Sequence, residues 1–351
     1  MKRVLAFFFL ALSCLSSVAQ QLSWEVVKVN KQQKFTKTVP PANYSGIAHI
    51  HGNLYAVVDD KSPRDGFYLF AIDIDSVNGR VLRAERLDFR GNEHPNRDAE
   101  GIAFDPESQH IYISGERDNH VLEYTIDGQR TGQRLSIPQF FRSARPNAGL
   151  ESLTYDAHNH TFWTTTELPL PADSLLTHRL QRFNSQMQPD LTVYYRMDEP
   201  EKRRRGRSHV HGISELLSVG PDSLLVLERE LFVPKQKIGA RVINKLYLVS
   251  MGVQGYKRLE SEMSSANTDS LSEDNLTPLT NKGIAAHLTE KRLLCRWQTR
   301  MNLTRRSLAN YEAMCLGPRL KDGSQVILLM ADSQNRFKGL LRDWFRTIIV
   351  R

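Results

Sequence analysis

A repeated unit of 51 to 60 residues constrains the fold of this chain more than any other feature. Each unit opens with a polar residue, a small residue and an apolar residue, passes through a turn, and closes on Asp or Glu after an apolar run. The five units run from Ser45-Gly46-Ile47 to Asp60, Glu100-Gly101-Ile102 to Glu116, Glu151-Ser152-Leu153 to Glu167, His211-Gly212-Ile213 to Glu228, and Glu312-Ala313-Met314 to Asp332. Two apolar runs joined by a short turn predict a β-hairpin, so the opening and closing polar residues of each unit should lie at the same end.

The spacing of these units predicts an all-β fold, the β-propeller. The units start at positions 45, 100, 151, 211 and 312, in steps of 55, 51, 60 and 101. Four-stranded blades repeated at such a period are typical of propellers, whereas a two-sheet sandwich gives no reason for the period. Because the last step is about twice the others, we expect six blades, one without the signature and with a loop near residues 254–280; five blades are the alternative. Residues 24–29 and 344–350 should pair and close the ring.

The N-terminus indicates export. Lys2 and Arg3 precede an apolar run, and small residues follow at 17–19, the pattern of a signal peptide over residues 1–20 cleaved near Ala19 or Gln20. The apolar run is shorter than the roughly 20 residues of a membrane-spanning helix. We therefore predict an exported protein, in the periplasm, on the outer surface or in the medium, with one domain over residues 21–351. A lipoprotein acylated at Cys14 is the alternative.

Charge and cysteine content bear on the partners. The chain has 47 Lys and Arg against 39 Asp and Glu, a net charge of +8. A basic surface attracts anions, and no nucleic-acid-binding module is visible. We therefore expect an anionic small molecule or an anionic component of the cell envelope as ligand, with no nucleic acid and no transmembrane segment. Cys295 and Cys315 form a disulfide or remain two buried thiols; both readings stay open.

Four groups of residues carry a resemblance to a known family. They are Arg97-Asp98-Ala99-Glu100-Gly101-Ile102-Ala103 with Ser114-Gly115-Glu116; Asn147-Ala148-Gly149-Leu150-Glu151-Ser152-Leu153 with Thr166-Glu167; Leu225-Val226-Leu227-Glu228-Arg229; and Asn310-Tyr311-Glu312-Ala313-Met314 with Ala331-Asp332-Ser333. Together they resemble the bacterial phytase-like family, described as "esterase-like activity of phytase". The resemblance implies an exported propeller related to hydrolases of phosphate or other esters, and propeller phytases hold calcium with carboxylates. Ser45 and His211 stand where other units have Glu, which departs from the pattern.

The repeat carboxylates form the predicted site. Carboxylates crowded at one end of a propeller raise each other's pKa and oppose folding unless a cation or arginines relieve the repulsion. Calcium suits such an all-oxygen set. The candidate metal ligands are Glu100, Glu151, Glu228, Glu312 and Asp332. The candidate catalytic residues are Glu100, Glu116, Glu151, Glu167 and His211. The candidate substrate-binding residues are Arg97, Arg117 and Arg229.

Two functions remain open at this stage. One is a cation-assisted hydrolase of phosphate esters or related esters. The other is a non-catalytic propeller that binds a ligand or an envelope component at its channel mouth, its carboxylates tied to arginines and backbone amides as scaffold. A basic stretch at residues 202–207 would add an anion-attracting rim, or is a solvated loop. The sequence has no Gly-x-Ser-x-Gly nucleophile elbow, so an α/β-hydrolase esterase mechanism is excluded.

Overall fold

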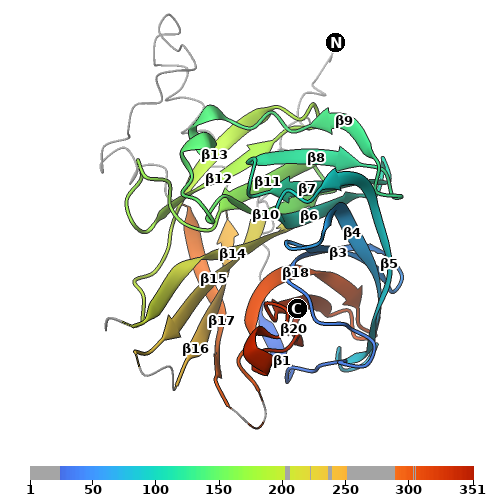
Figure 1. The fold of residues 1–351 in the computed structure, drawn as a ribbon, viewed down its shortest axis with the longest axis vertical. Coiled ribbons are helices and arrows are strands. Elements are labelled where there is room, and N and C mark those ends of the chain that lie inside the picture. Colours follow the sequence, from blue (N-terminus) through green and yellow to red (C-terminus); the bar gives the residue numbers. More distant parts are fainter. Residues whose placement is uncertain are drawn as a thin grey trace, which may run out of the picture.

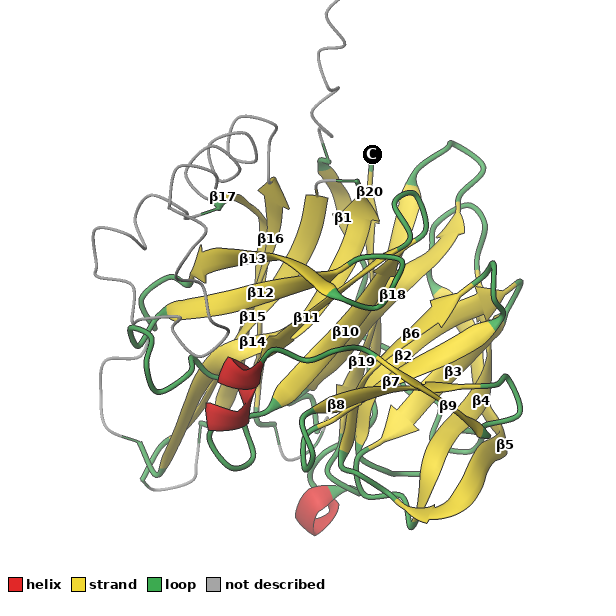
Figure 2. Cartoon of the chain, turned by 90° about the horizontal axis from the view of Figure 1, so that it is seen from above, coloured by secondary structure: helices red, strands yellow, loops and turns green. Residues whose placement is uncertain are grey.

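Almost all regular structure in the described part of this chain is β-strand. The computed structural model describes residues 24–201, 206–221, 223–235, 239–250, 289–302, 304 and 306–351. Within these ranges the helical structure consists of two short 3-10 turns, η1 (Gln139–Ser143) and η3 (Phe337–Gly339), drawn in red in Figure 2. In the same part of the chain, no helix is long and apolar enough to cross a membrane.

The strands form five antiparallel sheets of four strands each, the blades. The first blade contains β2 (Tyr44–His51), β3 (Leu54–Asp59), β4 (Arg64–Ile74) and β5 (Val81–Pro95). The second contains β6 (Ala99–Asp105), β7 (His110–Gly115), β8 (His120–Tyr124) and β9 (Arg130–Arg134). The third contains β10 (Leu150–Asp156), β11 (Thr161–Thr166), β12 (Thr177–Phe183) and β13 (Pro189–Arg196). The fourth contains β14 (Ser208–Gly220), β15 (Ser223–Val233), β16 (Arg241–Ser250) and β17 (Glu290–Arg300). The fifth contains β18 (Asn310–Arg319), β19 (Gln325–Asp332), β20 (Phe345–Val350) and β1 (Val26–Val29).

The blades are arranged around a central axis, as Figure 1 shows. The inner strands contact one another in the cyclic order β2, β6, β10, β14, β18 and back to β2. This arrangement is a five-bladed propeller. The prediction of a β-propeller is confirmed, and the expectation of six blades is wrong, five being the alternative that holds.

The expectation of six blades is wrong because of a feature of the fourth blade. The long step from residue 211 to residue 312 suggested a missing blade, but β17 pairs with β16 and completes the same sheet. The extra length therefore separates two neighbouring strands of one blade. The expected loop near residues 254–280 lies outside the described residues.

Strands from the two ends of the chain close the ring. Val26 pairs with Val350 and Val29 with Ile348 in an antiparallel ladder between β1 and β20. The outermost strand of the fifth blade thus comes from the N-terminal part of the chain. Its pairing with β20 closes the ring. The predicted pairing of the termini is confirmed.

The hydrophobic core is divided among the blade interfaces. One cluster lies between each pair of neighbouring blades; the cluster between the fourth and fifth blades includes Trp24, Leu246 and Trp344. Each fully buried large apolar side chain stabilises the fold by about 1.5–3 kcal/mol.

Cys295 and Cys315 are both free thiols, so the disulfide reading does not hold.

Candidate carboxylate site at one end of the channel

A β-bulge recurs at the same level of every inner strand. The pairing between the first and second strands of each blade skips a residue near the start of the inner strand. The skipped residues are Ser45, Glu100 with Gly101, Glu151, Ser214 and Glu312. A bulge leaves its residue out of the ladder and redirects its side chain. The bulges therefore give each blade one redirected polar residue at one end of the channel.

In each blade, the pairing of the first two strands also places one polar residue of the second strand beside the bulge. Tyr44 pairs with Asp59, Leu150 with Thr166 and Ile213 with Glu228, and the next residue along the second strand stands beside the bulge. These next residues are Asp60, Glu116, Glu167, Arg229 and Asp332. The carboxylate mouth, as we name it, consists of Glu100, Glu151, Glu312, Asp60, Glu116, Glu167 and Asp332, together with Arg229.

The carboxylates of the mouth act on one another electrostatically. Burial raises the pKa of Glu100 well above its ordinary value, and the charges of Glu151, Asp60 and Glu312 raise it further. Burial and the charge of Glu167 likewise raise the pKa of Glu151, which Arg229 partly lowers. The pKa of Asp332 is raised by burial and by Glu312. Carboxylates from separate blades thus share one site.

Arg229 neutralises only part of this charge. Its guanidinium donates hydrogen bonds to Glu312, to Glu167 and, at 2.9 Å, to the side-chain oxygen of Asn310. The arginine side chain is 6% exposed, so these pairs are shielded from water and hold the third, fourth and fifth blades together. Arg229 therefore pairs with no carboxylate of the second blade. A second cation, Lys61, pairs with Asp60 at 2.8 Å, and its charge partly offsets the burial that raises the pKa of Glu116.

Glu100 and Glu151 have no hydrogen-bond donor among the described residues. Each residue is 8% exposed, yet the carboxylate oxygens are not among the fully enclosed polar atoms. By contrast, Glu116 accepts the Gly149 N–H at 3.1 Å and Asp332 accepts the Gln334 N–H at 2.6 Å. A buried carboxylate without a donor is unfavourable by itself and is available to an incoming ligand.

Two residues predicted for the site lie elsewhere in the fourth blade. Glu228 points to the opposite side from Arg229, because successive strand residues alternate, and it accepts hydrogen bonds from the Tyr195 hydroxyl at 2.7 Å and Lys291 Nζ at 2.9 Å. His211 is half-buried, and burial lowers its pKa to about 4; the nearby charges are those of Glu230, Lys245 and His209. The structure does not bring Glu228 or His211 to the carboxylate mouth.

Two predicted arginines are also bound away from the channel. Arg97 is buried and donates to Asp118 at 2.9 Å and to the Ile113 carbonyl at 2.9 Å, inside the second blade. Arg117 is exposed at the rim and pairs with Asp98 at 3.1 Å. Of the three arginines, only Arg229 contacts the mouth. Residues 202–205 of the basic stretch lie outside the described residues.

Sequence reasoning missed Glu215. The bulge of the fourth blade falls at Ser214, so Ser214-Glu215-Leu216, and not His211-Gly212-Ile213, matches the openings of the other units. Glu215 is 2% exposed, and its carboxylate accepts the backbone N–H groups of Leu216, Met314 and Leu153, which lie in three different blades.

Comparison with known proteins identifies the family. A phytase-like family model, described as "Esterase-like activity of phytase", matches residues 40–334. The chain belongs to this family. No curated protein matches the sequence at a significant level.

Solved structures match this family member only at low identity and low TM-score. A luciferin-regenerating enzyme matches at 9% identity and TM-score 0.42, with 92% of this chain and 95% of that chain covered. A streptogramin B lyase matches at 9% identity and TM-score 0.36, with 91% and 97% covered. The exo-β-1,3-galactanase of Phanerochaete chrysosporium matches at 10% identity and TM-score 0.42, with 93% and 63% covered. These similarities are too weak to bear on function.

The family's relation to phytases raises the question of a cation at the mouth. Carboxylate oxygens are the donors that calcium prefers, and the donor-free carboxylates of Glu100 and Glu151 fit one. No three His, Cys, Asp or Glu side chains of the described residues, however, lie close enough to form a ready ligand set. Glu100 and Glu151 would supply at most two ligands to such a cation, and water or substrate oxygens would have to supply the rest.

Proposed function

We propose that this phytase-like propeller is a hydrolase of phosphate esters or related esters. It works at the carboxylate mouth with a divalent cation, and calcium is the first candidate. The observation that carries the proposal is the pair Glu100 and Glu151, two buried carboxylates to which no described residue donates a hydrogen bond. Cation binding would relieve the repulsion that raises their pKa values.

The charge of the mouth supports the need for a cation. Among the described residues, seven acidic side chains face two cations there, Arg229 and Lys61, of which Lys61 pairs with Asp60 at 2.8 Å. Acidic groups thus outnumber basic ones, so the mouth by itself repels an anionic substrate. A bound divalent cation is the largest local charge in such a site and reverses this preference. When bound, it would polarise the ester oxygen and lower the pKa of a water molecule.

The remaining residues supply positioning and proton transfer. Arg229 holds Glu167 and Glu312 in place. The pKa of Glu116 is raised, chiefly by burial, so its carboxyl group keeps a proton at higher pH than an exposed glutamate does. Glu116 is half-buried, and in this proposal it protonates the leaving alkoxide.

A non-catalytic, ligand-binding propeller is the second candidate. The buried ion pairs of Arg229 with Glu167 and Glu312 favour it, because they tie blades together as a scaffold does. In that case the paired carboxylates hold the ring, and Glu100 and Glu151 bind a cationic or cation-bridged ligand.

Calcium titration with ester substrates separates the two candidates. At a hundred times its dissociation constant, calcium should stabilise the protein by about 2.7 kcal/mol, measured by urea unfolding. Magnesium should stabilise it less, since it demands a smaller octahedral site. Calcium should also support hydrolysis of p-nitrophenyl phosphate or p-nitrophenyl butyrate. Glu100→Gln and Glu151→Gln should each abolish the stabilisation and lower kcat/KM at least about 100-fold.

Glu93→Gln is the matched control, because the Glu93 side chain is 89% exposed and pairs with Arg64 on the outer two strands of the first blade. It should leave both readouts unchanged. Calcium stabilisation without hydrolysis of either ester would favour the non-catalytic candidate. Indifference to calcium, combined with severe destabilisation by Arg229→Met, would identify the mouth as a salt-bridged scaffold.

The proposal includes export. The signal peptide expected over residues 1–20 lies outside the described residues. Its charged start, apolar run and small residues at 17–19 support cleavage near Ala19 or Gln20. Substrates of the hydrolase would then be esters present outside the cytoplasm.

A further inference from the structure

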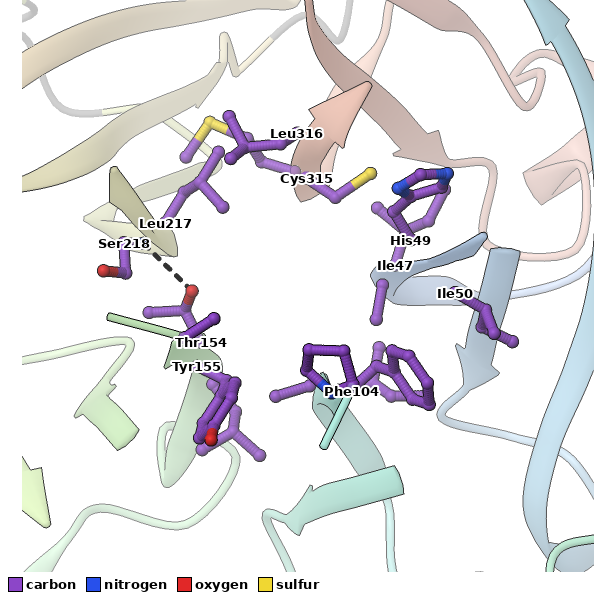
Figure 3. Close-up of a pocket in the computed structure, with 17 residues that line it drawn as sticks. Ile47, His49, Ile50, Phe104, Thr154, Tyr155, Leu217, Ser218, Cys315 and Leu316 are labelled. Atoms are coloured by element: carbon purple, nitrogen blue, oxygen red, sulfur yellow. Dashed lines mark hydrogen bonds between the residues drawn. The ribbon is translucent and has the colours of Figure 1, made fainter. Parts of the chain in front are cut away.

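The channel carries a second concave site at its other end. A cavity of about 280 Å³ is lined by side chains from all five inner strands, and Figure 3 shows them surrounding an open space. Its lining is largely apolar and includes Ile47, Phe104, Leu153, Tyr155, Leu217 and Met314. Nothing in the proposed hydrolase uses this cavity.

Strand geometry separates the cavity from the carboxylate mouth. Phe104 and Tyr155 lie four residues beyond Glu100 and Glu151 on the same strands, about 13 Å at 3.3 Å per residue. Glu215 lies between the two levels, because its carboxylate accepts the N–H groups of two lining residues, Leu153 and Met314. The cavity is therefore a separate site.

The chemistry of the lining excludes ions. The lining contains no Asp, Glu, Lys or Arg. Two of its polar groups are already used within the protein: the Thr154 hydroxyl accepts the Ser218 N–H at 2.9 Å, and His49 Nε2 lies 3.0 Å from the Gly52 carbonyl oxygen. The Ser218 hydroxyl is buried without a hydrogen-bond partner among the described residues, but a charged ligand would lose its hydration without gaining an oppositely charged partner.

Aromatic and sulfur groups favour a particular class of ligand. The rings of Phe104 and Tyr155 lie across the channel from Cys315, and Met314 adds a thioether (Figure 3). Polarisable sulfur atoms and aromatic rings make favourable contacts with another ring. The cavity volume lies just below the range of ligand pockets, roughly 300–1,000 Å³, so the ligand must be small.

We propose that this cavity binds a small, uncharged apolar molecule of about one or two aromatic rings. Binding depends on the five inner strands together, because each contributes to the lining. It is independent of the carboxylate mouth and of any cation bound there.

The test uses toluene, naphthalene and benzoate with the full-length chain. Saturation-transfer NMR and isothermal titration calorimetry should show saturable binding of toluene or naphthalene at one site. Benzoate, which adds a carboxylate to the same ring, should bind at least tenfold more weakly. Ala157 is an exposed lining residue in the turn after β10. Ala157→Trp should therefore cover the opening and weaken binding at least tenfold without disturbing the core.

The controls keep the proposal falsifiable. Val77→Trp adds the same bulk at a turn residue that is 66% exposed and does not line the cavity, and it should leave binding unchanged. Glu100→Gln should also leave toluene binding unchanged, even if it removes every effect of calcium. Absence of saturable toluene and naphthalene binding, equal affinity for benzoate, or equal loss in Ala157→Trp and Val77→Trp would each overturn the proposal.

Discussion

At the channel mouth, the position of a residue relative to the β-bulge decides its role more than its residue type does. Glu100 and Glu151 occupy equivalent bulges in neighbouring blades and lack hydrogen-bond donors among the described residues. Glu228 has the same side chain but points to the other side of its strand, where Tyr195 and Lys291 both donate to its Oε1 oxygen. A shift of one residue along the strand thus separates a candidate cation ligand from a glutamate held in a structural ion pair.

The raised pKa values of these two glutamates predict a pH-dependent effect of replacing them. A carboxyl group whose pKa is higher in the folded protein favours folding when protonated, so its contribution falls as pH rises from about 4.3 towards the folded value. In calcium-free buffer with EDTA, Glu100→Gln should gain stability relative to the wild type as pH rises from 4 to 7. The gain should be about 1.4 kcal/mol for each unit by which the pKa is raised. Urea unfolding at several pH values measures it; a difference that stays constant with pH would contradict the prediction.

Among the secondary-structure elements, the closing strand β1 joins the two ends of the chain. It pairs with β20, and the preceding Trp24 packs in the cluster between the fourth and fifth blades. Asn30, which follows the strand, donates through its side chain to Thr347 at 3.0 Å and to the Asn78 carbonyl at 3.0 Å. A four-residue strand therefore connects two blade interfaces.

Removing this strand should destabilise the whole ring. A chain that starts at residue 31 loses the β1–β20 ladder and the burial of Trp24, which alone is expected to contribute about 1.5–3 kcal/mol. We expect a loss of at least about 3 kcal/mol relative to a chain that starts at residue 24, measured by urea unfolding. The longer chain is the control, as it retains β1 and Trp24. Equal unfolding midpoints for the two chains would show that the ring does not need this closure.

At the scale of the whole molecule, charge is distributed unevenly. The sequence carries a net charge of +8, whereas the channel mouth gathers seven acidic side chains against two cations, Arg229 and Lys61. The basic residues therefore lie largely outside the mouth, and the far end of the channel is apolar. The molecule therefore has three chemically different regions: the acidic channel mouth, the apolar far end of the channel and the more basic remainder.

The proposed export of this molecule makes a direct prediction. Signal peptidase cleavage after Ala19 or Gln20 should give a mature chain that begins at Gln20 or Gln21. N-terminal sequencing and intact mass of the protein recovered from the periplasm or medium measure this. A mature N-terminus at an acylated Cys14 would identify a lipoprotein instead, and recovery of the uncleaved chain from the cytoplasm would contradict export.

The sequence by itself determined the propeller fold, the pairing of its ends and the residue types of the site. These features depend on local alternation and on a repeat period, both of which are visible along the chain. Glu100, Glu116, Glu151 and Glu167 were found in this way because their units have nearly equal lengths and turns. The mouth was predictable wherever the repeat was regular.

Only the tertiary structure decided the blade number, the direction of each side chain and the second cavity. The blade count depended on β17 pairing with β16, a contact between residues separated by a long segment. The fourth unit was misaligned because a bulge at Ser214 shifts the register, so Arg229 and not Glu228 reaches the mouth. A bulge depends on cross-strand hydrogen bonds that leave no mark in a single sequence. The cavity likewise exists only where five distant strands meet, since each contributes a few apolar residues indistinguishable from core.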